Sequence, residues 1–586
     1  MNPDLQIAIA SGAPVTTIYL TSGEADAENP KLLASYASQR EAGARAAYAM
    51  MAGVADEWTS LPISFDTTHI VELVTLKAKP TIQLVFVELP EDADHLATGG
   101  KHTLIRLIID PILVATTVRP EHATVEADSR YTSADVVALL VQLFEKFQPT
   151  VLRALDQAPD VRYVADPQWQ SFHDHPDHVV SARLVDRAAH AYCAAHRTAQ
   201  LMVLNYRAYN LAEVAANLDP AQHDAKVAVF AKYIEHDSKA SMKSPYVEYA
   251  QSQYYRWPRG GSWATRGSNG IWVFAVKSGS LVAWHQNGTF WDGPSKIGKA
   301  TNLAPYVSAT TDKTGRIHVF VREIDNNHSI LTIAQQKTKQ TWPVDFTNLG
   351  SPNPPAPDLS HTQVGLPLAA TTNGGLVVAF VRNGGGGLSS NVSAGTAWND
   401  LGGFELQDGM ATITTPDQKL WVFANTRFKL LRWSQSSPDQ PLVVDQALPI
   451  SNPIGAPGVT ALGAGIAIAF RSLQGAVSVL MPSSDQAIAI PGFCGPGGLA
   501  AATLGTGDSA RVIVIARDNA AGVQVAIQTS PAAFGDWVGL GGQLVDYPMA
   551  MSDAGKVMLF GLDFTGRLVV NEHDGANAFG GWHQFG

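Results

Sequence analysis

The sequence predicts a multidomain protein: an α/β, Rossmann-like domain over residues 1–257, then an all-β domain over residues 258–586 that folds as a seven-bladed β-propeller. The chain has 586 residues, more than one hydrophobic core usually organises. Its first part alternates apolar strands with helical periodicity, which is typical of a parallel sheet between helices. After Pro258-Arg259-Gly260-Gly261 this periodicity stops, glycine becomes frequent and short apolar strands recur, so we place the domain boundary there.

The composition excludes several classes of protein. A formal net charge of −11 argues against a nucleic-acid partner, because such proteins need clustered Lys and Arg. Cys193 and Cys494 are the only cysteines, which excludes a zinc site made of cysteines. No apolar run approaches the roughly 20 residues that span a bilayer, so we expect no transmembrane segment.

The first predicted strand is Val15–Ser22, which is rich in β-branched and apolar residues and carries no charge. This pattern is typical of a strand buried on both faces. The strand ends in a polar loop, Gly23–Asp26, and open α/β sheets bind ligands at the carboxyl ends of their strands. An Ala-rich helix over Lys31–Met51 follows, with Gly53 as its expected end.

The alternation of strands and helices continues as far as residue 156. Apolar and β-branched runs predict the strands, and apolar positions at helical spacing after a capping residue predict the helix. The expected elements are strands at His69–Lys77 and Thr81–Leu89, a short strand pair at Thr103–Ile109 and Ala123–Glu126, a helix over Ser133–Phe147, and a strand over Thr150–Leu155 that runs to Asp156.

The most informative motif is His173-Asp174-His175-Pro176-Asp177-His178, which places three imidazoles and two carboxylates around a proline. Pro176 suits the first position of a helix that we expect to reach Arg197. His175 and His178 are three residues apart there, so both can face one point, and a helix N-terminus disfavours protonated imidazole. The motif therefore predicts a metal site of a zinc hydrolase, and the alternative is a solvated turn with a helix cap.

Four pieces of sequence occur in a fixed order over about the first 257 residues: Ile18-Tyr-Leu-Thr-Ser-Gly-Glu24, Arg40-Glu41 in the Ala-rich helix, His175-Pro-Asp-His178, and Lys226 with Tyr233 and His236-Asp237 on a helix that opens at Asp219-Pro220. In this order they resemble the PIG-L/LmbE-like N-acetylglucosaminyl de-N-acetylases. The resemblance implies an enzyme that uses Zn²⁺ or another divalent metal to hydrolyse the N-acetyl group of an N-acetylated amino sugar of the GlcNAc type. The metal lowers the pKa of a bound water in such enzymes.

The resemblance also implies roles for seven residues. His178 is the metal ligand, and His175 and Asp177 are catalytic. The substrate-binding residues are Arg40, Glu24, Asp26 and Asp156. In these roles His175 stabilises the oxyanion or protonates the leaving amine, and Asp177 orients a histidine. For Glu24 and Asp26 the alternative is plain surface charge.

The sequence departs from this family at its start. Family members begin with a strand that ends in His-Pro-Asp-Asp, which supplies two of the three zinc ligands and the general base. This sequence opens at Met1-Asn2-Pro3-Asp4 and lacks that strand. Either the natural chain starts further upstream, where a signal peptide for secretion could also lie, or this is a short form with an incomplete metal site.

The second domain carries an internal repeat. Seven short apolar strands recur with a period of about 45 residues, which indicates the blades of a propeller. They end at Phe274, Phe320, Phe380, Phe423, Phe470, Ile515 and Phe560. Several units close with an aromatic residue and glycines, and the pattern is similar to tectonin-like and fucose-lectin-like propellers. Most of the tryptophans are expected to pack between blades, while others could stack on sugars.

We therefore weigh three hypotheses of function. The first is a zinc-dependent de-N-acetylase tethered to a glycan by its propeller, which raises its effective concentration there. The alternative is a non-catalytic, lectin-like carbohydrate-binding protein with an incomplete deacetylase domain. The third is an interaction scaffold whose propeller binds protein. The expected partner is an N-acetylated amino sugar or glycan, and the oligomeric state is open.

Overall fold

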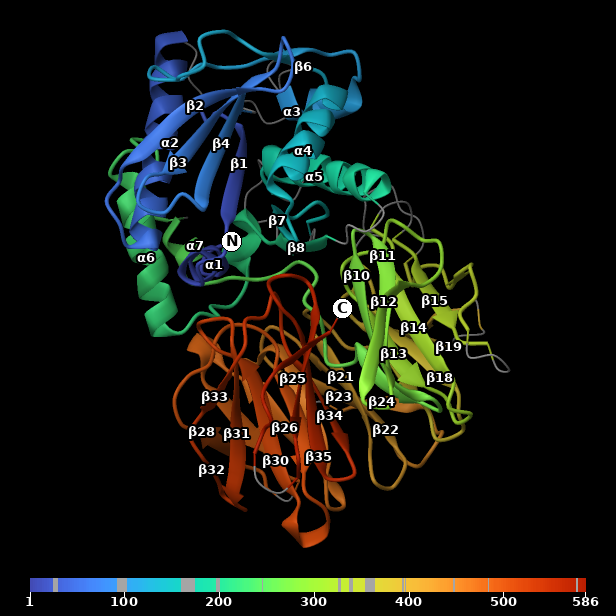
Figure 1. Cartoon of the computed structure of the whole chain (residues 1–586). Coiled ribbons are helices and arrows are strands. Elements are labelled where there is room, and N and C mark those ends of the chain that lie inside the picture. Colours follow the sequence, from blue (N-terminus) through green and yellow to red (C-terminus); the bar gives the residue numbers. More distant parts are fainter. Residues whose placement is uncertain are drawn as a thin grey trace.

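The structure is a computed structural model of the chain. It describes residues 1–24, 30–91, 103–159, 174–196, 201–244, 246–324, 328–336, 341–353, 364–392, 395, 397–445, 448–482, 484–575 and 578–585. An α/β region, called the front region here (residues 1–257), sits on one face of a large β domain (Figure 1). Within the described ranges, no helix is both long enough and apolar enough to span a membrane.

The front region is built on a mixed four-stranded sheet with the order β1-β4-β3-β2. β1 runs parallel to β4, whereas β3 runs antiparallel to both β4 and β2. β7 and β8 form a separate parallel pair. The strands are β1 (Val15–Thr21), β2 (Trp58–Ser64), β3 (Ile70–Leu76), β4 (Ile82–Leu89), β7 (Val151–Leu155) and β8 (Met202–Tyr206), with a short antiparallel pair of β5 (Ala115–Thr116) and β6 (Arg130–Tyr131).

Helices cover both faces of the four-stranded sheet, because its inner strands are apolar on both sides. One apolar cluster joins the sheet to α2, and another joins its opposite face to α3, α4 and α5. The helices are α1 (Asp4–Ala10), α2 (Pro30–Ala52), α3 (Thr103–Ile109), α4 (Ser133–Phe147), α5 (Pro176–Ala195), α6 (Pro220–Ile234) and α7 (Tyr246–Ala250), and a 3-10 helix, η3, spans Tyr209–Glu213. α6 packs against α2.

Particular residues explain where α4 begins and how closely α2 and α6 pack. α4 begins at a capping box: the Thr132 side chain accepts a hydrogen bond from the backbone N–H of Asp135, and the Asp135 carboxylate accepts one from the backbone N–H of Thr132. α2 and α6 approach closely at Gly43, where a Cβ atom would lie 2.8 Å from the ring of Tyr233. Glycine is required there by the contact between the helices.

The structure confirms β1, α2, β3, β4, α4 and β7 within a few residues of their expected ranges. The strand pair expected at 103–109 and 123–126 is wrong. Residues 103–109 form helix α3, in which Leu104 and Leu107 are buried on the side that contacts α5. β1 is also less buried than expected, because it is the end strand of its sheet.

The Rossmann-like arrangement stays a prediction for the front region. Its described strands form a mixed sheet and a separate parallel pair, rather than one parallel sheet. The predicted boundary at residue 257 falls between the end of α7 at Ala250 and the start of β9 at Ala264.

The β domain is a propeller of seven antiparallel sheets that follow one another along the chain. Each of the seven predicted strands is the second strand of a blade, so the predicted repeat is confirmed. Blades one to four are β9 (Ala264–Gly267), β10 (Gly270–Lys277), β11 (Ser280–Asn287) and β12 (Phe290–Lys296); β13 (Ser308–Thr311), β14 (Ile317–Arg322), β15 (Ile330–Ala334) and β16 (Thr347–Asn348); β17 (Leu368–Thr371), β18 (Val377–Arg382), β19 (Leu388–Val392) and β20 (Asn399–Asp400); and β21 (Met410–Thr414), β22 (Leu420–Asn425), β23 (Leu430–Gln435) and β24 (Leu442–Asp445).

The remaining blades have the same antiparallel order, with one additional strand in the sixth. They are β25 (Ile454–Leu462), β26 (Gly465–Arg471), β27 (Val477–Leu480) and β28 (Ala487–Ile490); β29 (Ala500–Leu504), β30 (Arg511–Arg517), β31 (Val523–Ser530), β32 (Ala533–Phe534) and β33 (Val538–Gly541); and β34 (Met549–Asp553), β35 (Lys556–Leu562), β36 (Leu568–His573) and β37 (His583–Phe585).

The first strands of the blades line the axis and close the ring. Each contacts the first strand of the next blade, and β34 of the last blade contacts β9 of the first. Every blade is continuous in sequence, so no strand is shared across the closure. Closure packs the first strand of each blade against its neighbours. An open array would leave the strands at its two ends exposed.

Tryptophans join neighbouring blades, as expected for most of them. The indole N–H groups of Trp398, Trp433 and Trp582 each donate a hydrogen bond of 2.9–3.0 Å to a backbone carbonyl of the preceding blade. The repeated aromatic residue therefore has a packing role at these three positions.

The front region and the propeller share one core. An apolar cluster runs from Met202, Leu204 and Tyr206 of β8 into the first, second and seventh blades. Beside this cluster the Asp4 carboxylate of α1 lies 2.8 Å from the guanidinium of Arg517, which ends β30. The Tyr206 hydroxyl donates to Asp4 at 2.8 Å, and the Tyr255 hydroxyl donates to the same oxygen.

We expect the Asp4→Asn substitution to lower the free energy of unfolding by about 3–5 kcal/mol, because it leaves the Arg517 charge buried without a counterion. Denaturant unfolding measures this cost. A matched control is Asp553→Asn, since Asp553 pairs with Arg266 at an exposed site between the first and last blades and should cost less than about 1 kcal/mol. Equal effects of the two substitutions would contradict the central role of Asp4.

We also expect the stability of the chain to fall as the pH drops from about 4 to about 2. Burial by itself raises the pKa of Asp4, but Arg517 and the tyrosine hydrogen bond outweigh it and lower the pKa from 3.8 to about 2. The charged form therefore stabilises the fold above the ordinary pKa, and this contribution is lost as the pH falls through the folded pKa. Thermal unfolding measured against pH should fall more steeply for the natural chain than for Asp4→Asn.

Candidate functional site

Helix α5 presents two imidazoles at its first turn. Pro176 is its first residue and His175 is the N-cap, whose Nδ1 accepts a hydrogen bond of 3.2 Å from the Asp177 backbone N–H. The ring centroids of His175 and His178 are 5.2 Å apart. Together with Asp174 and Glu91, they are called the imidazole cluster here.

Asp174 holds this turn together. Its carboxylate is buried and accepts hydrogen bonds from the backbone N–H groups of His175 at 2.7 Å and Tyr209 at 3.3 Å. The same oxygen lies 3.0 Å from Nδ1 of His178. Asp174 therefore fixes the orientation of His178. The sequence analysis gave Asp174 no role.

Glu91 and Glu24 lie on the other side of His175. Oε1 of Glu91 is 3.8 Å from Nε2 of His175, and the Glu91 backbone N–H donates to the Glu24 carboxylate at 2.8 Å. Ser22 donates to Glu24 at 2.6 Å. Burial raises the pKa of Glu24, and these hydrogen bonds oppose the shift. Glu24 is thus a buried residue beside the imidazole cluster.

Arg40 approaches the same loop from α2. Its Nε donates to the carbonyl of Gly23 at 3.1 Å, and its Nη1 lies 2.7 Å from Asp237 and 3.2 Å from the Tyr233 hydroxyl. The motif residues of α2 and α6 therefore meet. Lys226 of that motif is buried instead and donates to the backbone carbonyl of Tyr249 at 2.6 Å.

The remaining predicted residues differ in their surroundings. Asp177 is buried, with Oδ2 4.0 Å from His175 Nδ1. Asp156 lies 3.3 Å from Arg256, and burial raises its pKa to about 6 although Arg256 opposes the shift. Asp26 and His173 lie outside the described residues.

The described part of this cluster does not fit zinc. Over the described ranges, no three His, Cys, Asp or Glu side chains are arranged to hold a metal ion. Hydrolytic zinc sites use three protein ligands and a water. We derive no chemical step through a metal from these residues.

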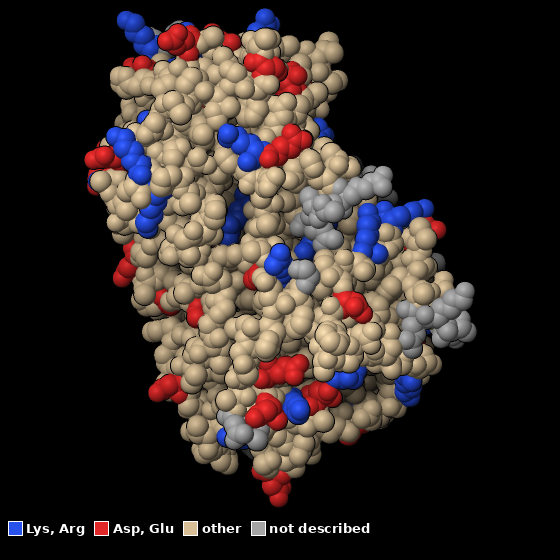
Figure 2. Space-filling view, in the orientation of Figure 1, with Lys and Arg blue, Asp and Glu red and all other residues tan. Residues whose placement is uncertain are grey.

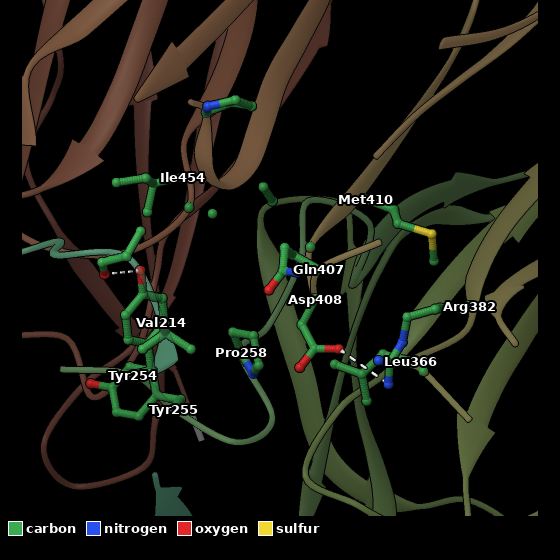
Figure 3. Close-up of a pocket in the computed structure, with 18 of the residues that line it drawn as sticks. Val214, Tyr254, Tyr255, Pro258, Leu366, Arg382, Gln407, Asp408, Met410 and Ile454 are labelled. Carbon is green, nitrogen blue, oxygen red and sulfur yellow. Dashed lines mark hydrogen bonds and ion pairs between the residues drawn. The ribbon is translucent and has the colours of Figure 1, made fainter. Parts of the chain in front are cut away.

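A cavity of about 490 Å³ lies where the front region meets the propeller. It is called the junction cavity here, and it lies over the propeller face that carries the turns between second and third strands. Its front wall comes from Arg207, Val214, Ala215, Asn217 and residues 254–255 and 258–260, and its floor from the loops of the second to seventh blades. Figure 3 shows Tyr254 and Tyr255 on one side of it and Arg382 and Asp408 on the other.

Three arginines surround Asp408 on the polar side of the junction cavity. Oδ2 of Asp408 lies 2.8 Å from Arg207 and 3.6 Å from Arg256, and Oδ1 lies 3.9 Å from Arg382. Two of these arginines belong to the front region and one to the third blade. The polar wall therefore combines side chains of both regions.

Tyrosines form the opposite, apolar side. The ring centroid of Tyr255 is 5.3 Å from that of Tyr547, and the Tyr255 hydroxyl is held by Asp4. Gly497 allows Tyr547 this position, because at its φ of +117° a Cβ would lie 1.9 Å from the ring. The rings are thus fixed before any ligand enters.

The sequence analysis missed every residue of the junction cavity, although one signal was present. Arginine recurs two residues after the aligned aromatic or apolar position at Arg322, Arg382 and Arg517, and directly after it at Arg471. All four are fully buried. A buried charge repeated in a propeller indicates a polar network at one end of the ring.

Comparisons with known proteins give only remote matches. No protein-family model matches the chain, and a search of curated proteins found no match. Among solved structures, the BP39L lectin from Burkholderia pseudomallei has 18% identity and a TM-score of 0.45, and the match covers 57% of this chain and all of that one. An Aleuria aurantia lectin in complex with Fucα1-6GlcNAc has 12% identity and a TM-score of 0.32, over 49% and 95% of the two chains.

The third similar structure is a variant of the NanB sialidase from Streptococcus pneumoniae, with 12% identity and a TM-score of 0.31 over 53% of this chain and 66% of that one. The assignment of a propeller does not depend on these matches, since it rests on the strand pairing. The resemblance of residues 1–257 to the de-N-acetylases stays a prediction.

Proposed function

We propose that this chain is a carbohydrate-binding protein and that the junction cavity receives the sugar. A sugar ring has an apolar face of C–H groups and a polar edge of hydroxyl groups. A site for it needs aromatic rings on one side and directed charged or amide groups on the other.

One observation carries this proposal. Tyr254 and Tyr255 lie on one side of the cavity, and Arg382 and Asp408 lie on the opposite side. Gln407 adds an amide to the polar side. Binding of the sugar requires both the front region and the propeller, because both contribute side chains to the two walls. The proposal is therefore the lectin-like alternative, with its site at the domain junction.

We expect the full chain to bind at least one sugar on a glycan array and in solution by calorimetry. Tyr254→Ala should weaken that binding about tenfold or more, because it removes an aromatic wall. The matched control is Phe290→Ala, since Phe290 is 75% exposed on β12 and does not line the cavity. Loss of binding in the control only would place the site elsewhere on the propeller, and no bound sugar would overturn the proposal.

A second candidate function is hydrolysis of the N-acetyl group of an amino sugar at the imidazole cluster. The observation that favours it is the convergence of His175, Glu91, Glu24 and Arg40 from four separate segments of the chain. In this candidate, water attacks the acetyl carbonyl and loses a proton to Glu91, and His175 gives a proton to the nitrogen as the C–N bond breaks, so that acetate and the free amine leave.

For this second candidate, we expect acetate release from N-acetylglucosamine oligomers, measured with and without added Zn²⁺. His175→Ala should reduce the rate by on the order of 100-fold or more, because it removes a proton-transfer group. His223→Ala, on α6 and outside the cluster, is the control and should not change the rate. Absence of acetate release under all metal conditions would overturn this candidate.

A further inference from the structure

The junction cavity meets solvent beside the third and fourth blades. Most of the described residues that line it are buried or half-buried, and the exposed ones mark where it opens, which is called the cavity mouth here. They are Ala215, Gly385, Glu405, Arg427 and Phe428. All but the first come from the third blade, the fourth blade or the segment between them. A ligand therefore enters the cavity past these residues.

Phe428 is the aromatic residue at the cavity mouth. It is 56% exposed and lies in the turn between β22 and β23. A single exposed apolar side chain is common on protein surfaces and by itself indicates nothing. Phe428 differs in two respects, because it lines a cavity and because the backbone that carries it is fixed.

Hydrogen bonds hold the turn of Phe428 from two sides. Thr426 is fully buried, and its hydroxyl oxygen accepts hydrogen bonds from the backbone N–H groups of Phe428 at 3.1 Å and Lys429 at 2.9 Å. On the other side, the carbonyl of Phe428 accepts one from the backbone N–H of Asn452 at 2.8 Å. The position of Phe428 is thus set in advance, which lowers the ordering cost of a ligand that stacks on its ring.

This turn lies beside the polar wall of the junction cavity. The backbone N–H of Gln407 donates to the carbonyl of Asn425 at 2.7 Å, at the end of β22. Gln407 directly precedes Asp408, and Asn425 is three residues before Phe428. Asp408 and Phe428 therefore belong to neighbouring segments that border one cavity. A ligand held at Asp408 can extend towards Phe428.

The cavity is larger than a single sugar needs. Its volume of about 490 Å³ lies in the range of pockets that enclose most of a drug-sized molecule, which is comparable in size with a disaccharide. A second sugar would present its C–H face to an aromatic ring and its hydroxyl groups to polar side chains. Arg427 and Glu405, exposed at the same mouth, supply a donor and an acceptor for those hydroxyl groups.

We propose that Phe428 forms a second sugar subsite at the cavity mouth, so that the ligand is an oligosaccharide of at least two sugars. This inference rests on the proposed carbohydrate-binding function and adds the length of the ligand. The inner sugar lies between the tyrosines and Asp408. The next sugar lies against the ring of Phe428, with its hydroxyl groups towards Arg427 and Glu405.

The experiment compares sugars of different length by calorimetry on the full chain. The pairs are N-acetylglucosamine with chitobiose, galactose with lactose, and glucose with cellobiose. For at least one pair, we expect the disaccharide to bind about fivefold or more tightly than the monosaccharide, because it adds stacking on an aromatic ring. This comparison needs no variant, so it does not depend on the stability of a substituted chain.

Phe428→Ala tests the assignment of the subsite. We expect it to lower the affinity for the disaccharide to that for the monosaccharide, with the affinity for the monosaccharide unchanged. Phe428→Trp keeps an aromatic ring and should keep the gain. The matched control is Phe493→Ala, because Phe493 is 51% exposed between β28 and β29 and does not line the cavity. It should leave both affinities unchanged.

The outcomes separate this inference from the proposed function. Equal binding of both members in every pair that binds would overturn the second subsite and leave the proposed function standing. A gain that Phe428→Ala does not change would overturn the assignment to Phe428. If no member of any pair binds, both proposals are overturned.

Discussion

The arrangement of this molecule depends on one buried ion pair, between Asp4 of α1 and Arg517 of the sixth blade. An isolated carboxylate or guanidinium at this depth would cost several kcal/mol. Here each charge has a partner, and Tyr206 and Tyr255 donate to the remaining oxygen of the carboxylate. Because these four residues come from α1, β8, the segment between α7 and β9, and β30, they fix the front region on the propeller at one angle.

The junction cavity is a consequence of that docking. Tyr255 contributes to the ion-pair network with its hydroxyl and to the cavity with its ring. β8 is fully buried against the propeller. Arg207 directly follows it and pairs with Asp408 of the propeller. The site is therefore a property of the interface, since both regions contribute side chains to each of its walls.

The sequence predicted the parts of the fold that repeat or have a clear period. The seven blades were predictable because each second strand has an apolar run at nearly constant spacing, and α4 because its apolar residues follow a helical period. β2 contains Pro62, which argues against a strand, and residues 103–109 fit either a strand or a helix. Their structure is decided by packing against other elements, which local sequence does not encode.

The site was predictable only in part, for a related reason. The motif at 173–178 could be found because its residues are neighbours along the chain. Arg207 and Asp408 are separated by 201 residues, and each by itself is an ordinary charged residue. Only the docked structure shows that they meet, and the pairing of Asp156 with Arg256 likewise joins residues far apart in the sequence.

The closure of the ring without a shared strand has a further consequence. Each blade of this propeller is continuous in sequence. The first and last blades therefore meet at a seam, where neither a shared strand nor hydrogen bonds between described strands join them. The segment between α7 and β9 bridges that seam, because Arg259 pairs with Asp546 and the Tyr255 hydroxyl lies 3.2 Å from the carbonyl oxygen of Val545, both just ahead of the last blade. The segment that joins the two regions thus holds the first and last blades together. The stability of the closed ring therefore depends on how the front region is docked on it.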